Sequence, residues 1–579
     1  MRTQGYLIPG AVLLSLLASW TAGDGETMRF PLVSVASWLL AVIMVVAVAR
    51  PSGPSDPGST WTRRDTATAA ALMLVAAPLR LASLDRIPWL LGGDEGSVGL
   101  AAQEFCQGAR DNIFGVSWFS FPSLFFVLPG GSIGLFGRTI FALRLPSAIA
   151  GIVTIPALYW ATRGMFGRTV ATVSSAYLAT FHFHIHFSRL AINNAWDALF
   201  ITLFMGLFWR AWSTGRKGCF VVAGLTLGLA QYFYVSSRAL IVVVPIWLLL
   251  AAIRDFGLLR RRLPGLAFML WGAAVVSLPI ALFFARHPNE FLAPFSRVVI
   301  LGDPIRQESL RVGDPQWLLL WDQLHYTILG LFSAQFRLWY QGAPMLLPIA
   351  ACLFLIGIVI SLKRLLDLRF AWLCLVLLSA VVASTVTDYV PSAQRFVHMA
   401  PTAAVLVSLP ISRLYAMARL SRLGVRRLLP AVGVFLLLAA AAHDVYFYFV
   451  EYSPSGRFSD IETETANRIA DHMMATSPLD QTYLFGLPSM GFATPSMRYI
   501  LGEDVGEDVV GPIYGEATFD LSGPTLFIFL PERLDELSLV ANAYPGGARQ
   551  DVYGHAGELL FVSYYVEGWP GQPPAGPAN

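Results

Sequence analysis

The sequence predicts a polytopic α-helical membrane protein that carries a small α/β domain at its C-terminal end. Of its 579 residues, 55% are hydrophobic and 13% are charged, whereas soluble domains carry about a quarter charged residues. Apolar runs of about 20 residues recur from Tyr6 to Val450, and a run of that length crosses a bilayer as a helix. After Glu451 the composition becomes that of a soluble domain.

About thirteen transmembrane helices are expected, and the basic loops between them set their orientation. The spans cover residues 6–22, 30–49, 66–84, 139–162, 169–187, 194–213, 219–235, 238–253, 264–285, 343–362, 370–387, 396–413 and 428–449. Counted in order, the spans bring six arginine-rich loops to one side, which the positive-inside rule makes cytoplasmic. The other side then receives the loops 85–138 and 286–342 and everything after Glu451.

The spans and the changes in composition divide the chain into four parts. Residues 1–50 form two additional N-terminal helices, and residues 51–65 form a cytoplasmic linker rich in Pro, Gly and Ser. Residues 66–450 form the main transmembrane domain, and residues 451–579 form the outer α/β domain. The first span is expected to remain in place, and the alternative is a secretory signal cut near Ala22, which leaves the other spans oriented as before.

The outer segments show two further patterns. Trp118–Leu128 is aromatic and too short to span, so it is expected to lie flat in the membrane interface, with a re-entrant or buried loop as the alternative. The C-terminal domain reads as helix, strand, strand, helix and strand, over Glu462–Ser477, Thr482–Gly486, Pro524–Leu530, Glu532–Ala543 and Leu559–Val566. Its expected role is to bind an acceptor or to cap the membrane site.

Charge and cysteine content exclude several classes. The net charge is +3 and the basic residues lie in loops, which speaks for membrane topology and against nucleic acid as a partner. No Cys-x-x-Cys occurs among the four cysteines, and three of them lie inside apolar runs. The sequence therefore predicts neither a disulfide nor a thiolate metal site. The four are Cys106, Cys219, Cys352 and Cys374.

Two adjacent carboxylates, Asp94 and Glu95, follow the third span closely. A bland interpretation is a helix cap with an acid in the first turn. However, four arginines stand at the outer ends of spans, against the bias that orients the chain, and they need an anion there. That anion is either a lipid headgroup or a bound phosphate, and the second makes a phosphate-bearing substrate beside a carboxylate base the working hypothesis. The four are Arg144, Arg189, Arg238 and Arg395.

Aromatic and histidine residues supply candidate substrate contacts. His182, His184 and His186 alternate with apolar residues, so on an extended segment they would share a face and hold a metal. On a helix they spread apart, and packing or substrate hydrogen bonding is then expected, with no metal. Tyr234 belongs to an aromatic run that stacks on a sugar or forms the interfacial belt. Candidate substrate contacts are His184, His186, Tyr234 and His398.

Several stretches together resemble the bacterial branch of the dolichyl-phosphate-mannose-protein mannosyltransferase superfamily. This is glycosyltransferase family 39 with its relatives, among them the lipid A aminoarabinose transferase. The likeness extends over roughly residues 66–415. It is carried by Asp94-Glu95, by Arg144–Gly151 with Leu158-Tyr159 and Phe166–Arg168, and by Phe187–Arg189, with weaker echoes in Gly342–Pro348, Gln394–Phe396 and Ala400-Pro401.

The resemblance implies a GT-C fold, a polyprenyl-phosphate-linked sugar donor, and transfer of a hexosyl or pentosyl group with inversion on the outer face of a bacterial or archaeal plasma membrane. Asp94 then corresponds to the family's base and Glu95 to its neighbour. The charge pattern itself places the phosphate against two or more of Arg189, Arg238 and Arg395, with Arg144 as a further candidate, and no metal or other cofactor is expected because arginine neutralises the charge. The chain departs from the pattern through its two extra helices and its C-terminal domain, which leaves lipid, glycan and protein acceptors open.

Two other classes of protein fit the pattern less well. A transporter or flippase of lipid-linked sugars usually shows internal repeats and broken helices near the midplane, and no repeat is visible. A non-catalytic membrane sensor leaves the outer arginines unexplained.

Overall fold

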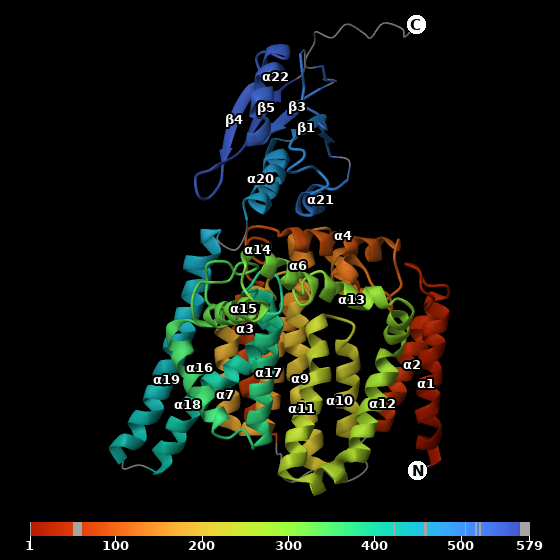
Figure 1. The fold of residues 1–579 in the computed structure, drawn as a ribbon, viewed down its shortest axis with the longest axis vertical. Coiled ribbons are helices and arrows are strands. Elements are labelled where there is room, and N and C mark those ends of the chain that lie inside the picture. Colours follow the sequence, from red (N-terminus) through yellow and green to blue (C-terminus); the bar gives the residue numbers. More distant parts are fainter. Residues whose placement is uncertain are drawn as a thin grey trace.

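The computed structural model describes residues 2–49, 61–420, 423–456, 460–476, 478–503, 505–515, 518–519, 521 and 523–567. Most of the predicted linker, residues 51–60, lies outside this set. The chain forms a bundle of long helices with a mixed α/β unit at one end (Figure 1). This arrangement places the apolar sequence and the soluble-like sequence in separate bodies.

Each predicted span overlaps one or two helices of the bundle. Seven helical stretches of the described residues are long and apolar enough to cross a membrane, so the chain is a multi-pass helical membrane protein, while the count of thirteen stays a prediction. The bundle helices are α1 (Arg2–Ala22), α2 (Pro31–Ala49), α3 (Arg63–Leu81), α6 (Ile140–Phe166), α7 (Arg168–Thr180), α8 (His182–Ser188), α9 (Asn194–Thr214), α10 (Lys217–Ala230), α11 (Ala239–Arg254), α12 (Phe256–Arg286), α16 (Pro348–Leu362), α17 (Leu368–Thr385), α18 (Ala400–Leu420) and α19 (Leu423–Tyr446).

Two sequence expectations about these segments need correction. The range 169–187 is two helices rather than one, because Phe181 takes an extended conformation (φ −62°, ψ 110°) between α7 and α8. The aromatic segment 118–128 does not lie flat on a surface. It enters α5 (Ser123–Phe136), where Phe125 and Phe126 are buried inside the protein.

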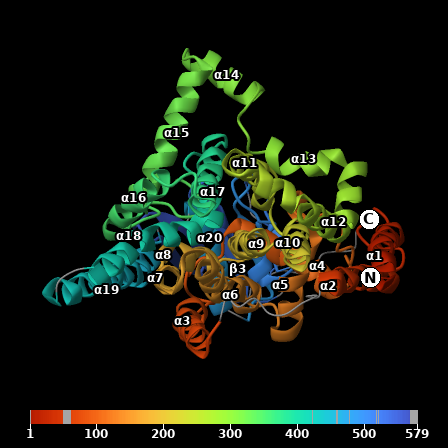
Figure 2. The same cartoon turned by 90° about the horizontal axis from the view of Figure 1, so that it is seen from below.

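Short helices lie at the same end of the bundle as α4 (Gly93–Gln107). Figure 2 shows α14 and α15 reaching outward from the rim of the bundle. The remaining helices of this layer are η1 (Trp118–Ser120), η2 (Val235–Arg238), α13 (Pro288–Ser296), α14 (Asp303–Val312), α15 (Gln316–Phe332) and η3 (Ala393–Met399), and π-helical and 3₁₀ turns, η4 (Phe447–Tyr452) and η5 (Ser453–Ser455), extend α19.

The C-terminal unit is a five-stranded sheet in the order β2-β1-β3-β5-β4. β1 pairs in parallel with β2 and β3, whereas β5 pairs antiparallel with β3 and β4. Alternate residues point to opposite faces, so one face packs on α20 and the other on α22. The elements are α20 (Ile461–Thr476), β1 (Gln481–Phe485), α21 (Pro495–Leu501), β2 (Glu507–Asp508), β3 (Thr525–Phe529), η6 (Pro531–Glu536), α22 (Leu537–Ala543), β4 (Ala548–Tyr553) and β5 (Leu559–Val566).

The C-terminal unit docks on α4 and on the loop before it. α20 contributes Asn467, whose side-chain amide exchanges two 2.9 Å hydrogen bonds with the backbone of Leu91. Arg468 on the same helix stacks over Trp89, with its Cζ atom 4.8 Å from the ring centroid. α21 lies directly against α4. The soluble-like unit therefore holds the segment that contains the two adjacent carboxylates.

Candidate active site

Glu95 anchors the first turn of α4 inside the protein. Its carboxylate accepts two hydrogen bonds from Arg144, through Nε and Nη2 at 2.9 Å each, and one from the N–H of Ala191 at 2.7 Å. Both charged side chains are buried. The other Arg144 hydrogen bonds go to backbone carbonyls of the loop after α3, at Leu84, Pro88 and Leu90.

Arg189 is held in a similar cage. Its guanidinium donates hydrogen bonds of 2.7–3.1 Å to four backbone carbonyls at the end of α3 and in the following loop. The side chain is fully buried. Arg144 donates five hydrogen bonds to protein oxygens and Arg189 donates four, which leaves little of either guanidinium for the phosphate that both were expected to bind. The four carbonyls are those of Leu79, Ala82, Ser83 and Ile87.

Asp94 points away from this anchor. Successive residues on an α-helix are about 100° apart around the axis, so the inward position of Glu95 sends its neighbour to a different face. The Asp94 side chain is exposed and lines a pocket at this end of the bundle. Within the described part of the chain, its carboxylate makes neither a hydrogen bond nor an ion pair. It is thus free to accept a proton or a hydrogen bond from a ligand.

The pocket brings together segments that are far apart in the sequence. Arg395, from η3, lines it together with Tyr234, which precedes η2. Arg395 Nη1 donates to the Tyr234 hydroxyl at 3.0 Å, and the buried Arg395 Nε has no partner among the described residues. The pocket therefore combines an unpaired carboxylate with an arginine that retains an unused donor.

The electrostatics of Asp94 suit a proton acceptor. Although part of the Asp94 side chain reaches solvent, the protein atoms around its carboxylate and, second, the negative charge of Glu95 raise the pKa of Asp94 to about 6. A carboxylate with a raised pKa holds a proton more readily than an ordinary aspartate and is still largely ionised near pH 7.

Four other predicted site residues lie outside the pocket lining. Arg238 donates to the Phe291 carbonyl at 2.9 Å and its guanidinium stacks on that ring at 4.0 Å. His184 is buried against Arg80, with Nδ1 2.8 Å from Arg80 Nη2. The remaining two are held elsewhere: His186 Nε2 donates to the Trp339 carbonyl at 2.7 Å, and His398 Nε2 lies 3.2 Å from the Ser379 hydroxyl.

The wall of the pocket contains residues that sequence reasoning did not select. Trp339 lines it in a left-handed backbone conformation (φ 66°) that a tryptophan rarely adopts. Asn194 also lines it and donates to the Gln394 carbonyl at 3.2 Å, which joins two walls. Arg297 stacks on Phe119, a wall residue, at 4.7 Å and adds a second guanidinium at the rim. Only the aromatic run at 118–121 carried a sequence signal.

Among the described residues, no group of three or more His, Cys, Asp or Glu side chains gathers as metal ligands. The described pocket presents the Asp94 carboxylate and the Arg395 guanidinium.

Comparison with known proteins bears on this arrangement. The family model described as dolichyl-phosphate-mannose-protein mannosyltransferase matches residues 122–281. No curated protein matches the chain. Among solved structures, ArnT from Cupriavidus metallidurans in the apo state aligns with a TM-score of 0.51 at 15% identity, over 87% of this chain and 98% of that chain.

The oligosaccharyltransferase AglB from Archaeoglobus fulgidus, in complex with an inhibitory peptide and a dolichol-phosphate, aligns with a TM-score of 0.50 at 13% identity, over 89% of this chain and 75% of that chain. At such identities the alignments show a common fold. The predicted resemblance is thereby confirmed: the chain has the GT-C fold of these membrane glycosyltransferases and resembles the dolichyl-phosphate-mannose-protein mannosyltransferases in sequence over residues 122–281.

Proposed function

We propose that this chain is a membrane glycosyltransferase that moves a sugar from a polyprenyl-phosphate donor to an acceptor hydroxyl on the outer face of a bacterial or archaeal plasma membrane. The observation that carries the proposal is the Asp94 carboxylate, which lies unpaired in a pocket shared with Arg395. The same fold in AglB, solved with a dolichol-phosphate, supports a lipid phosphate as the donor group.

In the proposed reaction, Asp94 accepts the proton of the acceptor hydroxyl as its oxygen bonds to the anomeric carbon. The bond from that carbon to the phosphate oxygen breaks on the opposite side, so the configuration inverts and polyprenyl phosphate leaves. Arg395 faces the growing charge on the phosphate, and a fixed cation at such a position is usually the larger contribution to rate. General-base help contributes about 10²–10⁴-fold.

The other charged residues have supporting roles in this proposal. Glu95 and Arg144 fix the first turn of α4, so that Asp94 meets the pocket at one angle. Arg189 shapes the loop that leads into α4. Residues 66–450 form the catalytic unit, with residues 1–50 as an addition. The C-terminal unit lies on the outer side as a cap, and lipid, glycan and protein acceptors all remain compatible with it.

Replacement of the proposed base tests the reaction. Purified Asp94→Asn protein in vesicles, supplied with candidate polyprenyl-phosphate sugars, should release polyprenyl phosphate about 10²–10⁴-fold more slowly than the wild type. Asp85→Asn is the matched control, because Asp85 is an exposed acid of the same loop that does not line the pocket. Unchanged turnover in Asp94→Asn, with the wild type active, would remove Asp94 from the role of base.

A second pair of variants tests the phosphate contact. Arg395→Gln should raise the KM for the donor and lower kcat, because a cation facing the leaving phosphate acts in both states. Arg238→Gln should leave the donor KM close to that of the wild type, since Arg238 lies among aromatic rings outside the pocket. A larger effect at Arg238 than at Arg395 would contradict this assignment.

A further inference from the structure

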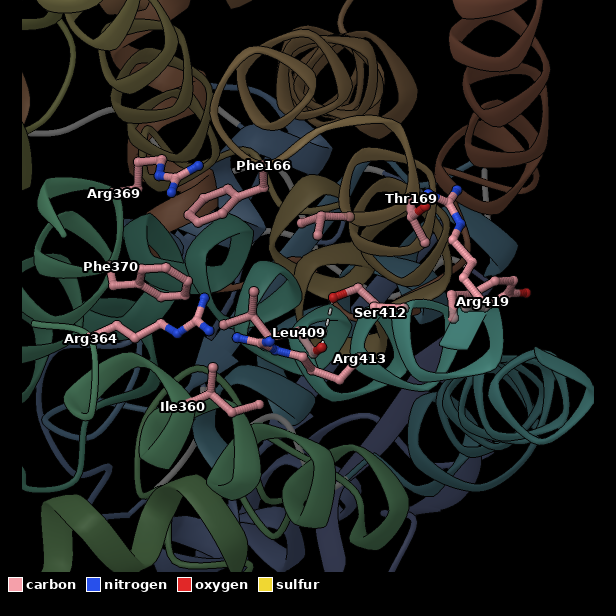
Figure 3. A pocket seen from close by; sticks show the side chains of 13 residues that line it. Phe166, Thr169, Ile360, Arg364, Arg369, Phe370, Leu409, Ser412, Arg413 and Arg419 are labelled. Carbon is pink, nitrogen blue, oxygen red and sulfur yellow. Dashed lines mark hydrogen bonds between the residues drawn. The ribbon is translucent and has the colours of Figure 1, made fainter. Parts of the chain in front are cut away.

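A second charged pocket lies at the opposite end of the bundle from Asp94. It is bounded by the ends of α16 and α18 and the beginnings of α7 and α17 (Figure 3). Four arginines line it, although the described lining contains no acidic residue: Arg364, Arg369, Arg413 and Arg419. A concentration of like charge in one hollow is unfavourable unless an anion compensates it.

Among the residues that the structure describes, only one of the four arginines has an acidic partner. Arg369 forms an ion pair with Asp367, at 2.6 Å between Nη2 and Oδ2, and donates to the Met165 carbonyl at 3.0 Å. It also stacks on Phe166, whose ring meets that of Phe370 edge to face at 5.4 Å. Phe166 and Phe370 therefore form an aromatic part of the pocket wall beside the charged groups.

The other three arginines are left for a ligand. The Arg364 guanidinium stacks over Phe370 at 5.7 Å, and the guanidinium groups of Arg364, Arg413 and Arg419 make no hydrogen bond or ion pair with any residue that the structure describes. Figure 3 shows the guanidinium groups of Arg364 and Arg413 pointing toward one another in the middle of the pocket. Two unpaired guanidinium groups at one point match the several oxygens of a phosphate.

Neutral donors and apolar walls complete the pocket. Thr169 and Tyr415 line it, and their hydroxyls make no hydrogen bond to another described residue, whereas Ser412 donates to the Leu409 carbonyl at 2.7 Å. Ile360 and Val170 also belong to the wall. Since apolar side chains continue from the charged groups along membrane helices, a ligand with a phosphate and an acyl chain fits better than a free anion.

We propose that this pocket binds the phosphate group of an anionic membrane lipid. Arg364, Arg413 and Arg419 supply the charge, and Thr169 and Tyr415 supply neutral hydrogen-bond donors. Basic pockets between membrane helices at the cytoplasmic side are suited to such headgroups. The lipid would bridge α7, α16, α17 and α18 at the end of the bundle remote from Asp94, so the site does not depend on the proposed reaction.

The test compares lipid retention by the full-length protein. Wild type and Arg364→Gln/Arg413→Gln are purified into phosphatidylcholine nanodiscs with and without phosphatidylglycerol, and native mass spectrometry measures the retained phosphatidylglycerol. The double variant should retain no more than about one tenth of the phosphatidylglycerol that the wild type retains, because two charge-assisted contacts are lost. The matched control is Arg260→Gln/Arg261→Gln, which removes two exposed arginines at the same end of the bundle and should retain as much as the wild type.

Further arms make each outcome decisive. Tyr415→Phe keeps all charges and should still lower retention about threefold to tenfold, which covers the case of a double variant that fails to fold. Inorganic phosphate is titrated against thermal unfolding in phosphatidylcholine nanodiscs. Arginine-dependent stabilisation by inorganic phosphate, without retention of phosphatidylglycerol, supports the phosphate site and overturns the lipid as its source. Equal loss in the control, or no binding of either probe, overturns the proposal and leaves these arginines as topological charges.

Discussion

Asp94 and Glu95 are neighbours in the chain with opposite roles in the structure. Glu95 is buried, bidentate with Arg144 and bonded to a backbone N–H, so its charge is fully compensated. Removal of one partner of such a pair usually costs about 3–5 kcal/mol. The Asp94 carboxylate has no such partner among the described residues, and its pKa is raised. One residue fixes the geometry, and the next is left reactive.

The raised pKa of Asp94 predicts a specific pH dependence. Only the ionised carboxylate accepts a proton, so transfer should rise about tenfold per pH unit below about 6 and level off above it. The folded-state pKa lies above the ordinary value of 3.8, so ionisation of Asp94 costs stability. Relative to Asp94→Asn, the wild type should therefore lose thermal stability as the pH rises from about 4 through about 6.

The measurement is the rate of polyprenyl phosphate release at saturating donor, together with thermal unfolding of both proteins over the same pH range. A transfer rate that does not change between about pH 5 and about pH 7 would show that Asp94 is not the group whose ionisation limits the reaction.

At the scale of residues, the sequence predicted the residues that line the pocket better than it predicted which arginines are buried by the fold. Asp94, Tyr234 and Arg395 were predicted as site residues and line one pocket. Arg144 and Arg189 looked like anion binders because they stand near the outer ends of spans. The backbone carbonyls that accept their hydrogen bonds come together only when the loop after α3 folds back, and no sequence pattern predicts that fold.

At the scale of elements, the contact between α4 and α21 couples the C-terminal unit to the site. Gly96 and Gly99 on α4 allow it: a Cβ atom on Gly96 would lie 2.5 Å from the backbone of Pro495 and Ser496, and one on Gly99 would lie 2.4 Å from the ring of Tyr499. Glycine permits this close approach of two helices because it lacks a side chain. Both contacts lie within two turns of Asp94.

Gly96→Ala should loosen this contact and reduce transfer. The obstacle at position 96 is backbone, so α21 must shift away from α4. We expect faster hydrogen exchange in α21 and about a tenfold lower rate of transfer, since small misplacements at a reacting group are costly. Gly93→Ala is the matched control, because nothing lies within 4 Å of a Cβ atom at Gly93.

Equal hydrogen exchange in α21 of Gly96→Ala and of the wild type would show that the contact does not hold the C-terminal unit. Slower transfer in Gly93→Ala as well would show that added side-chain bulk in the first turn, rather than the contact with α21, lowers the rate.

Element boundaries followed hydropathy closely, and the failures have local causes. The apolar ranges overlap bundle helices throughout, because length and composition decide a membrane helix. The break at Phe181 was missed because Phe and His alternate there without Gly or Pro to mark it. α5 was missed as a helix because an apolar segment shorter than a span resembles an interfacial one, and the sequence does not show that its first turns pack inside the protein.

At the scale of the whole molecule, the bundle has two chemically different ends. α4 and the C-terminal unit occupy one end (Figure 1), where the pocket that contains Asp94 also lies, and the arginine-lined pocket lies at the other end. The positive-inside rule predicts that the arginine-rich end faces the cytoplasm. If this orientation holds, the proposed sugar transfer and the proposed lipid contact lie on opposite sides of one membrane.

A native cysteine tests this orientation without disturbing the fold. Cys106 is exposed and lies in the last turn of α4, the helix whose first turn contains Asp94. A membrane-impermeant maleimide applied to intact cells should therefore label the protein, and Cys106→Ser should abolish most of that label. The other three cysteines lie on the bundle helices α10, α16 and α17. The predicted spans place them in the bilayer, which a charged reagent does not enter, although Cys352 is exposed on the surface of the bundle.

The opposite end supplies the control. Arg260→Cys, placed in the Cys106→Ser background, puts a thiol at an exposed position among the basic residues. It should react only after the membrane is permeabilised, because the reagent cannot otherwise reach the cytoplasm. The opposite orientation would be shown by labelling of Arg260→Cys in intact cells, together with labelling of Cys106 in the wild type only after permeabilisation. Asp94 would then face the cytoplasm, and the proposal of transfer on the outer face would fall with it.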